Sequence, residues 1–187
     1  LQEPVFRHFH TLCQIPHPSF REEQISRYLF DWACERGLEA HRDAYRNVLI
    51  RKPAAAEYEN APGVMLQAHM DMVCEKASGA AHDFETDPIR WQIEGDRINT
   101  NGRTTLGADD GIGVALALEV LFTTAEEEDF SGAAGFDIAV MRSKYLINLD
   151  HCCDREFLCG SCGGQAAELK VPVESGAVPE GWIACTL

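Results

Sequence analysis

Residues 64–71 read VMLQAHMD, an apolar run that ends in two ionisable side chains, His69 and Asp71. The run is typical of a buried β-strand. Apolar runs of this kind, bounded by helical segments, indicate strands that are covered on both faces, as in an α/β sheet. Because ligands of open α/β sheets bind at the carboxyl ends of the strands, the stretch predicts both the fold class and the position of a site.

The remaining segments fit the same architecture. Apolar spacing predicts helices over residues 3–13, over about 21–36, and after Gly113. Ser19 and Glu22 have the form of a capping box at the start of the second helix. Strands are predicted over residues 47–52, 63–69, 120–124, 144–150, 167–173 and 182–187, and a hairpin over 89–102 with its turn at Gly95-Asp96. The sequence therefore predicts a mixed, mostly parallel sheet covered by helices.

One stretch does not fit this arrangement. The helix after Gly113 and the strand that leads to Thr123 both draw on the residues ALEVLF, 117–122. A helix of ordinary length and a connection to the next strand need more residues than are present, and no turn former lies between them. We hypothesise that the sequence omits a segment between about Leu116 and Leu121.

Charge and hydropathy narrow the classes of partner. The net charge of the 187-residue chain is −14, which argues against nucleic acid and anionic membranes as partners. No run of eighteen apolar residues is present, so no membrane span is expected. The first residues lack the pattern of a secretion signal, and we expect a cytoplasmic protein.

The chain contains eight cysteines, and without a secretion signal we expect them to be reduced. Four of them cluster at Cys152, Cys153, Cys159 and Cys162. A structural zinc site normally uses two spaced pairs, whereas one of these pairs is adjacent in sequence. The pattern therefore argues against a cysteine zinc site.

Four separate segments share one pattern, an apolar run followed by acids or histidine. They are VMLQAHMD, TTLGADDG, VLFTTAEEE and LINLDH. At one edge of a sheet they would bring together His69, Asp71, Asp109 or Asp110, Glu126 or Glu127, and Asp150. Carboxylates gathered in a dry cleft repel one another, and a divalent cation removes that repulsion. Imidazole with carboxylates suits zinc, with manganese or cobalt as substitutes, and this many ligands can hold two ions.

Two further roles follow from the residue types. A metal-bound histidine usually donates its other ring N–H to a carboxylate, and Asp71 fits that position beside His69. Adjacent glutamates suit a division of labour, in which one binds metal and the other accepts a proton from the attacking water. Each motif alone also has a structural interpretation as a turn, a helix cap or a solvated face. Their coincidence at four predicted strand ends favours a site.

The motifs AHMDMV, TTLGADDGIG, TTAEEE and LINLDHCCDREFLCGSCGG together resemble the aminoacyl-histidine dipeptidases, which are cytosolic di-zinc metallopeptidases related to peptidase T and carboxypeptidase G. The resemblance implies that residues 1–163 are the N-terminal part of a zinc-peptidase-like catalytic domain. Residues 164–187 would begin an incomplete α+β lid and dimerisation domain. A homodimer is implied for the full-length protein.

The resemblance also implies a role for each site residue. His69 and Asp150 would bind the first zinc, Asp109 would bridge both ions, and Glu127 would bind the second. Glu126 would be the general base and Asp71 the partner that orients His69. Asp110 occupies a place usually held by asparagine in the family and is excluded as a ligand.

The implied activity is hydrolysis of a dipeptide, of the Xaa-His type such as β-alanyl-histidine. The family has one more zinc-binding histidine near its C-terminus, which this chain lacks, so we expect a fragment with little peptidase activity alone. Two alternatives stay open. One is an N-acyl-amino-acid deacylase or tripeptidase on the same scaffold, and the other is a non-catalytic metal-binding or cysteine-based redox module.

Overall fold

The computed structural model describes residues 3–117 and 121–151, together with residues 156, 158 and 159. One compact unit covers Leu1–Cys152. The predicted strands over 167–173 and 182–187, and the predicted domain beginning at residue 164, lie outside the described residues. The hypothesis of an omitted segment also stays a prediction, because residues 118–120 are outside the described part.

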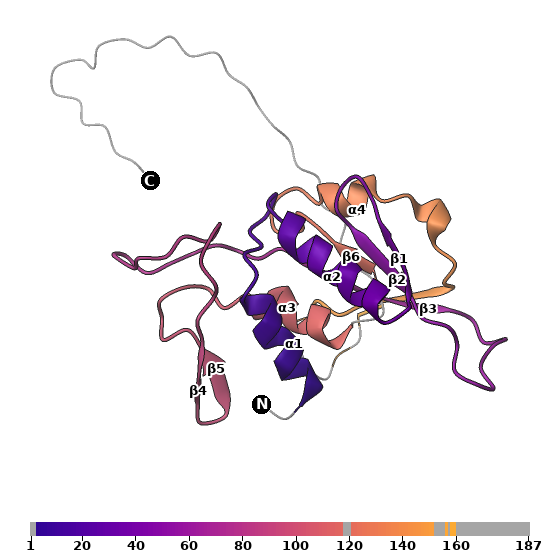
Figure 1. Ribbon diagram of the computed structural model, residues 1–187, viewed down its shortest axis with the longest axis horizontal. Coiled ribbons are helices and arrows are strands. Elements are labelled where there is room, and N and C mark those ends of the chain that lie inside the picture. Colours follow the sequence, from indigo (N-terminus) through magenta and orange to yellow (C-terminus); the bar gives the residue numbers. More distant parts are fainter. Residues whose placement is uncertain (1–2, 118–120, 152–155, 157, 160–187) are drawn as a thin grey trace, which may run out of the picture. The chain divides into compact units, whose positions relative to one another are not determined.

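A five-stranded mixed sheet forms the centre of this unit (Figure 1). Its strands, in spatial order, are β1 (Glu39–Arg42), β2 (Val48–Arg51), β6 (Leu121–Thr123), β3 (Val64–His69) and β7 (Tyr145–Asn148). β3 pairs in parallel with both β6 and β7, whereas the β1–β2 and β2–β6 pairings are antiparallel. The prediction of a mixed α/β sheet is confirmed, and its parallel part is the part that carries His69.

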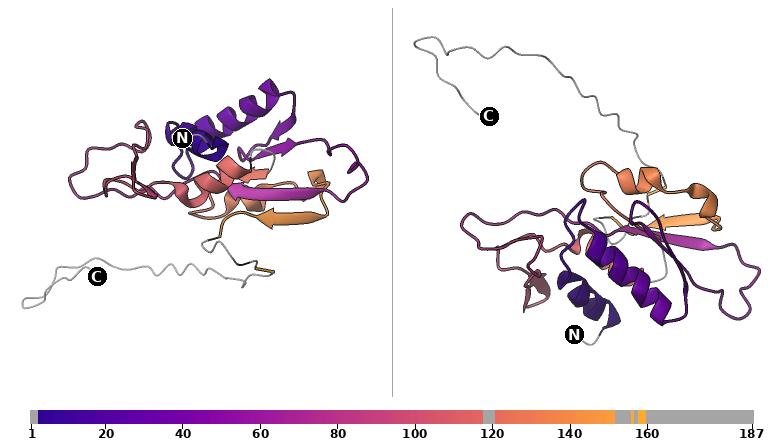
Figure 2. Two further views of the ribbon diagram at one scale, coloured as in Figure 1. Left: turned by 90° about the horizontal axis from the view of Figure 1, so that it is seen from below. Right: turned by 45° about the horizontal axis from the view of Figure 1, so that its top comes forward.

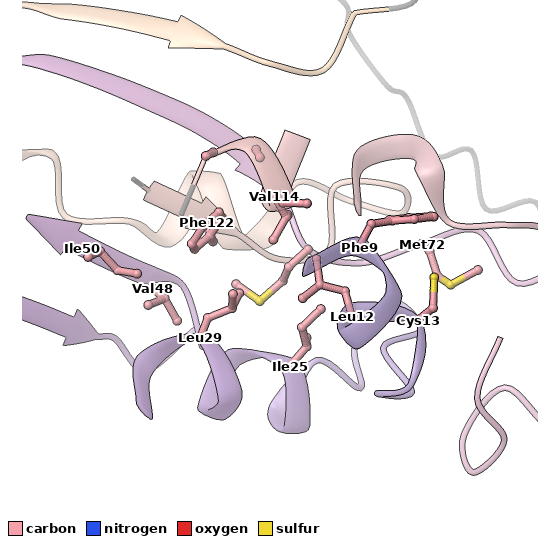
Figure 3. Packing of buried hydrophobic residues seen from close by; sticks show 14 of the residues in the cluster. Phe9, Leu12, Cys13, Ile25, Leu29, Val48, Ile50, Met72, Val114 and Phe122 are labelled. Carbon is pink, nitrogen blue, oxygen red and sulfur yellow. The ribbon is translucent and has the colours of Figure 1, made fainter. Parts of the chain in front are cut away.

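Three helices cover one face of the sheet (Figure 2). They are α1 (Pro4–Cys13), α2 (Glu23–Glu35) and α3 (Ala108–Leu116), close to the three predicted helices. Their apolar sides meet alternate residues of the strands in one cluster, drawn in Figure 3, that includes Phe9, Leu12, Ile25, Leu29, Val48, Ile50, Ala68, Val114 and Phe122. Among the described residues, no helix is both long and apolar enough to cross a membrane.

The opposite face of the sheet has a smaller cover. Side chains alternate along a strand, so Leu49, Met65 and Leu121 point away from the large cluster. They pack against the segment that contains α4 (Ser131–Gly135) and the short 3-10 helix η1 (Ile138–Val140). β7 is exposed along its length at the edge of the sheet.

The predicted hairpin is confirmed as β4 (Gln92–Glu94) and β5 (Arg97–Asn99). Glu94 pairs with Arg97, so the turn consists of Gly95 and Asp96 as expected. Gly95 has a φ of +63°, a conformation in which a glycine has no steric cost.

The predicted capping box is wrong. Helix α2 begins after Glu22, and no side chain caps its first turn. The Ser19 hydroxyl donates instead to Asp71 Oδ2 at 2.8 Å, and Glu22 Oε1 accepts a hydrogen bond from the Phe20 amide at 2.7 Å. Both polar side chains are therefore engaged outside the helix, one of them with a residue of the predicted site.

Leu29 lies in the middle of the packing between α2 and the sheet, and its side chain has no exposed area. Figure 3 shows it directed toward Val48 and Phe122. We expect Leu29→Ala to lower the free energy of unfolding by about 2–5 kcal/mol, since it removes buried methyl groups and leaves a cavity. Urea denaturation followed by circular dichroism measures the change.

Leu116 is the matched control because it is 62% exposed on α3. Leu116→Ala should change the unfolding free energy by less than about 0.5 kcal/mol. Equal effects of the two substitutions would contradict the packing described for α2.

Candidate metal centre

Four segments meet around the imidazole of His69. The ring's Nε2 lies 3.0 Å from Asp109 Oδ1, and 3.9 Å from both Glu126 Oε2 and Asp150 Oδ2. His69 ends β3, Asp109 stands at the start of α3, and the other two acids follow β6 and β7. Because β6, β3 and β7 are adjacent and parallel, their carboxyl ends share one edge of the sheet. The convergence that the sequence predicted is present.

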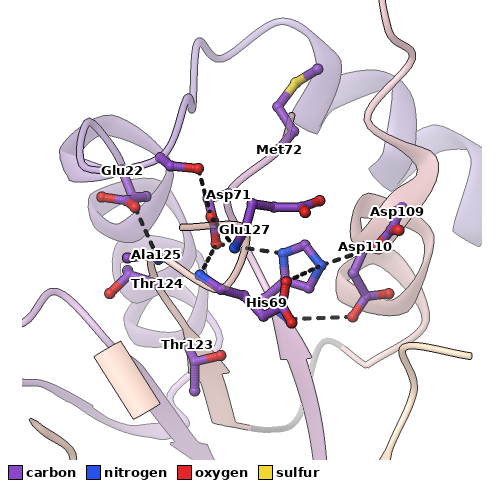
Figure 4. A network of polar contacts seen from close by, with 12 residues as sticks. Glu22, His69, Asp71, Met72, Asp109, Asp110, Thr123, Thr124, Ala125 and Glu127 are labelled. Atoms are coloured by element: carbon purple, nitrogen blue, oxygen red, sulfur yellow. Dashed lines mark hydrogen bonds and ion pairs between the residues drawn. The ribbon is translucent and has the colours of Figure 1, made fainter. Parts of the chain in front are cut away.

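Asp71 faces the other nitrogen of the same ring (Figure 4). Its Oδ1 lies 3.4 Å from His69 Nδ1, within ion-pair range but long for a hydrogen bond. The Asp71 carboxylate also accepts hydrogen bonds from the Ser19 hydroxyl and from the amides of Glu126 and Glu127. His69 and Asp71 are each only 1% exposed. Asp71 therefore connects the orientation of the ring to the position of the two glutamates.

The electrostatics of the cluster are those of acids crowded around one base. Burial lowers the pKa of His69, but contacts with Asp71 and Asp109 outweigh this and raise the pKa to about 10. Burial and then the neighbouring carboxylates raise the pKa values of Glu126, Glu127 and Asp150, although the His69 charge opposes this. Ionised acids here repel one another, so a bound cation would favour their charged forms.

Within the described part of the chain, two groups of side chains could hold a metal ion. One contains His69, Asp109 and Asp150, and the other contains His69, Glu126 and Glu127, with ligand atoms within 4.8 Å of one another in each group. Imidazole with carboxylates is a donor set that suits zinc. Nε2 of His69 can bind only one ion, so the second group would need a further ligand. Asp109 belongs to the first group, and its side chain is 72% exposed.

Asp110 has a different role from its neighbour. It is buried, and its two oxygens accept hydrogen bonds from the His69 amide at 3.2 Å and from the Gly113 amide at 3.1 Å. Burial, together with the charges of Asp150 and Asp109, raises the pKa of Asp110 to about 7, against the opposing effect of His69. The side chain connects the end of β3 to the first turn of α3, and both of its oxygens are used there.

Ser19 and Glu22 are residues of this region that the sequence assigned to a helix cap. Glu22 Oε1 accepts a hydrogen bond from the Ala125 amide at 3.1 Å, next to the two glutamates. Each side chain has one partner more than 50 residues away in sequence, Asp71 for Ser19 and Ala125 for Glu22, so no local pattern could identify these two contacts. The cysteine cluster is represented in the described residues only by Cys159, which is exposed.

The sequence and the structure were compared with those of known proteins. No family model matches the chain. The chain is 41% identical over 193 residues to the cytosol non-specific dipeptidase of Escherichia coli K12, and the match covers 96% of this chain and 40% of that protein. The crystal structure of aminoacylhistidine dipeptidase from Vibrio alginolyticus matches with a TM-score of 0.75 and 41% identity, over 79% of this chain and 33% of that one. Over the matched residues, the chain is similar to these two dipeptidases.

Two structures with lower sequence identity share the fold of this chain. Aminopeptidase PepT from Bacillus cereus ATCC 10987 matches with a TM-score of 0.67 at 23% identity, over 81% of this chain and 44% of that one. A tripeptidase from Staphylococcus aureus gives 0.66 at 21% identity, with the same two coverages, 81% and 44%. The chain spans 40% of the E. coli relative and 33% of the V. alginolyticus relative. Similarity to dipeptidases therefore applies to a part of those proteins.

Asp71 should be the acid on which the stability of this site depends most. Asp71→Ala would leave three partly buried donors without an acceptor, and we expect a loss of about 3 kcal/mol in the free energy of unfolding. Ser19→Ala removes only one of these hydrogen bonds and should cost about 1 kcal/mol. Urea denaturation in the presence of a chelator measures both, and equal losses would contradict the central place of Asp71.

Proposed function

We propose that this chain is part of a metal-dependent dipeptidase, a hydrolase that acts on peptide bonds. One observation supports the proposal most directly: three carboxylates from three other segments surround Nε2 of the buried His69. In the proposal, His69 and Asp150 hold one zinc ion, Asp109 bridges to a second, and Glu127 binds that second ion. Manganese or cobalt could replace zinc, since they accept the same donors.

Zinc bound at this position would polarise the scissile carbonyl and acidify the attacking water. Glu126 is the proposed general base, because its carboxylate faces the same imidazole nitrogen and its side chain is 30% exposed, which leaves it open to water. It would accept the proton of the attacking water and then deliver it to the leaving amine. Asp71 would hold the His69 ring in a fixed orientation through Nδ1.

The proposed substrate is a dipeptide, of the Xaa-His type such as β-alanyl-histidine. The name of the V. alginolyticus relative supports this class, and the name of the E. coli relative supports dipeptides more broadly. The name of the E. coli relative, a cytosol dipeptidase, supports a cytoplasmic location. The family resemblance supports a homodimer, which is also part of the proposal. A tripeptidase is the second candidate, because the S. aureus tripeptidase shares the fold.

Zinc binding distinguishes the dipeptidase from a cysteine-based module. We expect His69→Ala to weaken zinc affinity by at least about 100-fold, since it removes a ligand shared by both candidate groups. Cys162→Ser should leave the affinity within about twofold of the unsubstituted protein. Competition titration with a chromophoric chelator measures both. Loss of binding only in the cysteine variant would favour the cysteine-based module.

Catalysis by the complete protein tests the role of Glu126. Glu126→Gln keeps the size of the side chain but removes its ability to accept a proton, so kcat on β-alanyl-histidine should fall by about 10²–10⁴-fold. The number of zinc ions bound should not change, because Glu126 is not a proposed ligand. Glu128→Gln, at an exposed neighbouring position, is the control and should retain normal turnover. Substantial turnover by Glu126→Gln would contradict its assignment as the base.

A further inference from the structure

The turn after β6 determines where Glu126 and Glu127 point. Its first residue, Ala125, is buried and has a φ of +53°, in the left-handed region that non-glycine residues rarely adopt. The Ala125 carbonyl accepts hydrogen bonds from the amides of Asp129 and Phe130. A backbone in this conformation persists only where its surroundings hold it.

Buried carboxylates hold three successive amides of this turn. The Ala125 amide donates to Glu22 Oε1 at 3.1 Å, the Glu126 amide to Asp71 Oδ1 at 3.0 Å, and the Glu127 amide to Asp71 Oδ2 at 3.2 Å. Figure 4 shows Glu22 and Asp71 approaching the turn from different elements. Hydrogen bonds from an amide to a carboxylate are stronger than those between neutral groups. Glu22 and Asp71 therefore restrain the backbone that bears both glutamates.

Glu22 immediately precedes α2, and its buried side chain does not cap that helix. Its side chain is 1% exposed, its Oε2 has no hydrogen-bond partner among the described residues, and the nearest positive group is Arg46 Nη1 at 3.6 Å. A carboxylate buried in this way is unfavourable unless its contacts compensate. No side-chain bond caps α2, so the compensating contacts of Oε1 are with Phe20 and with the turn.

We propose that Glu22 is a positioning residue of the metal centre, which holds the Ala125 turn so that Glu126 and Glu127 face His69. That Glu22 restrains the turn is inferred from the hydrogen bond between the Ala125 amide and Glu22. That this restraint matters for metal binding rests on the proposed function. The hydrogen bonds of Glu22 Oε1 are with the Phe20 and Ala125 amides, so Glu22 acts through the backbone. The turn thus receives one support from the residue that precedes α2 and one from Asp71, two residues after β3 ends.

Three substitutions distinguish the effect of the hydrogen-bond acceptor of Glu22 from the effect of its negative charge. Glu22→Gln retains a carbonyl oxygen that can accept from Phe20 and Ala125 but removes the charge. Glu22→Asp keeps the charge near Arg46 but shortens the side chain by one methylene, so it loses reach to Ala125. Glu22→Ala removes both. Glu23→Ala is the matched control, because the neighbouring Glu23 also pairs with Arg46, yet its side chain is 50% exposed and does not contact the turn.

Hydrogen exchange of the metal-free protein and titration with Co²⁺ give the two readouts. In Glu22→Ala and Glu22→Asp, exchange should rise at least about tenfold in peptides that cover residues 124–127, and Co²⁺ affinity should fall about 10–100-fold. For Glu22→Gln, the exchange rate of the turn and the Co²⁺ affinity should both stay within about threefold of the unsubstituted protein. Glu23→Ala should match the unsubstituted protein in both quantities. The visible spectrum of bound Co²⁺ reports a change of coordination that a general loss of stability would not cause.

The outcomes separate the inference from the proposed function. Unchanged exchange and unchanged Co²⁺ affinity in Glu22→Asp would overturn the inference and leave the dipeptidase proposal intact. This test does not depend on whether Glu22→Ala folds. An increase in exchange across the whole protein, equal to that of the turn, would likewise overturn it. Absence of Co²⁺ binding by the unsubstituted protein would refute the proposed function and, with it, the positioning role.

Discussion

The contact between one buried imidazole and the carboxylates around it is the constraint on which the described structure depends. His69 ends the central parallel strand, and both of its ring nitrogens face acids. Such a group of like charges would separate if its side chains were free to move, since burial makes their repulsion stronger. Asp71, Asp110 and Glu22 hold the surrounding backbone through buried hydrogen bonds, and so keep the acids close together.

The sequence alone could predict the mixed sheet and the meeting of its strand ends. Strand periodicity and apolar runs are local properties, and they indicated β2, β3, β6, β7 and the β4–β5 hairpin. Parallel neighbours place their carboxyl ends together, so acids after separate strands could be expected to converge. This argument reached His69, Asp71 and Asp150, together with one acid of each adjacent pair, Asp109 or Asp110 and Glu126 or Glu127, without any knowledge of distances. The family resemblance narrowed the choice at the adjacent acids.

Other features were beyond the reach of local patterns. β1 reads EAHR and lies at the edge of the sheet, where no apolar run marks it. Helix α4 is five residues long and rich in glycine and alanine, which is too short for a periodic signal. Ser19 and Glu22 each contact a residue of the site that lies 52 and 103 residues away, respectively, and the capping pattern gave an incorrect local explanation for both. Contacts of that sequence separation follow from the tertiary fold.

Anomalous diffraction at the zinc absorption edge, from crystals of this protein grown with zinc, tests the central claim most directly. The account predicts a peak about 2.0–2.1 Å from His69 Nε2, with Asp109 and Asp150 as further ligands. A second peak about 3.5–4 Å from the first would fit a shared carboxylate. Zinc bound at the cysteines, with none beside His69, would contradict the account.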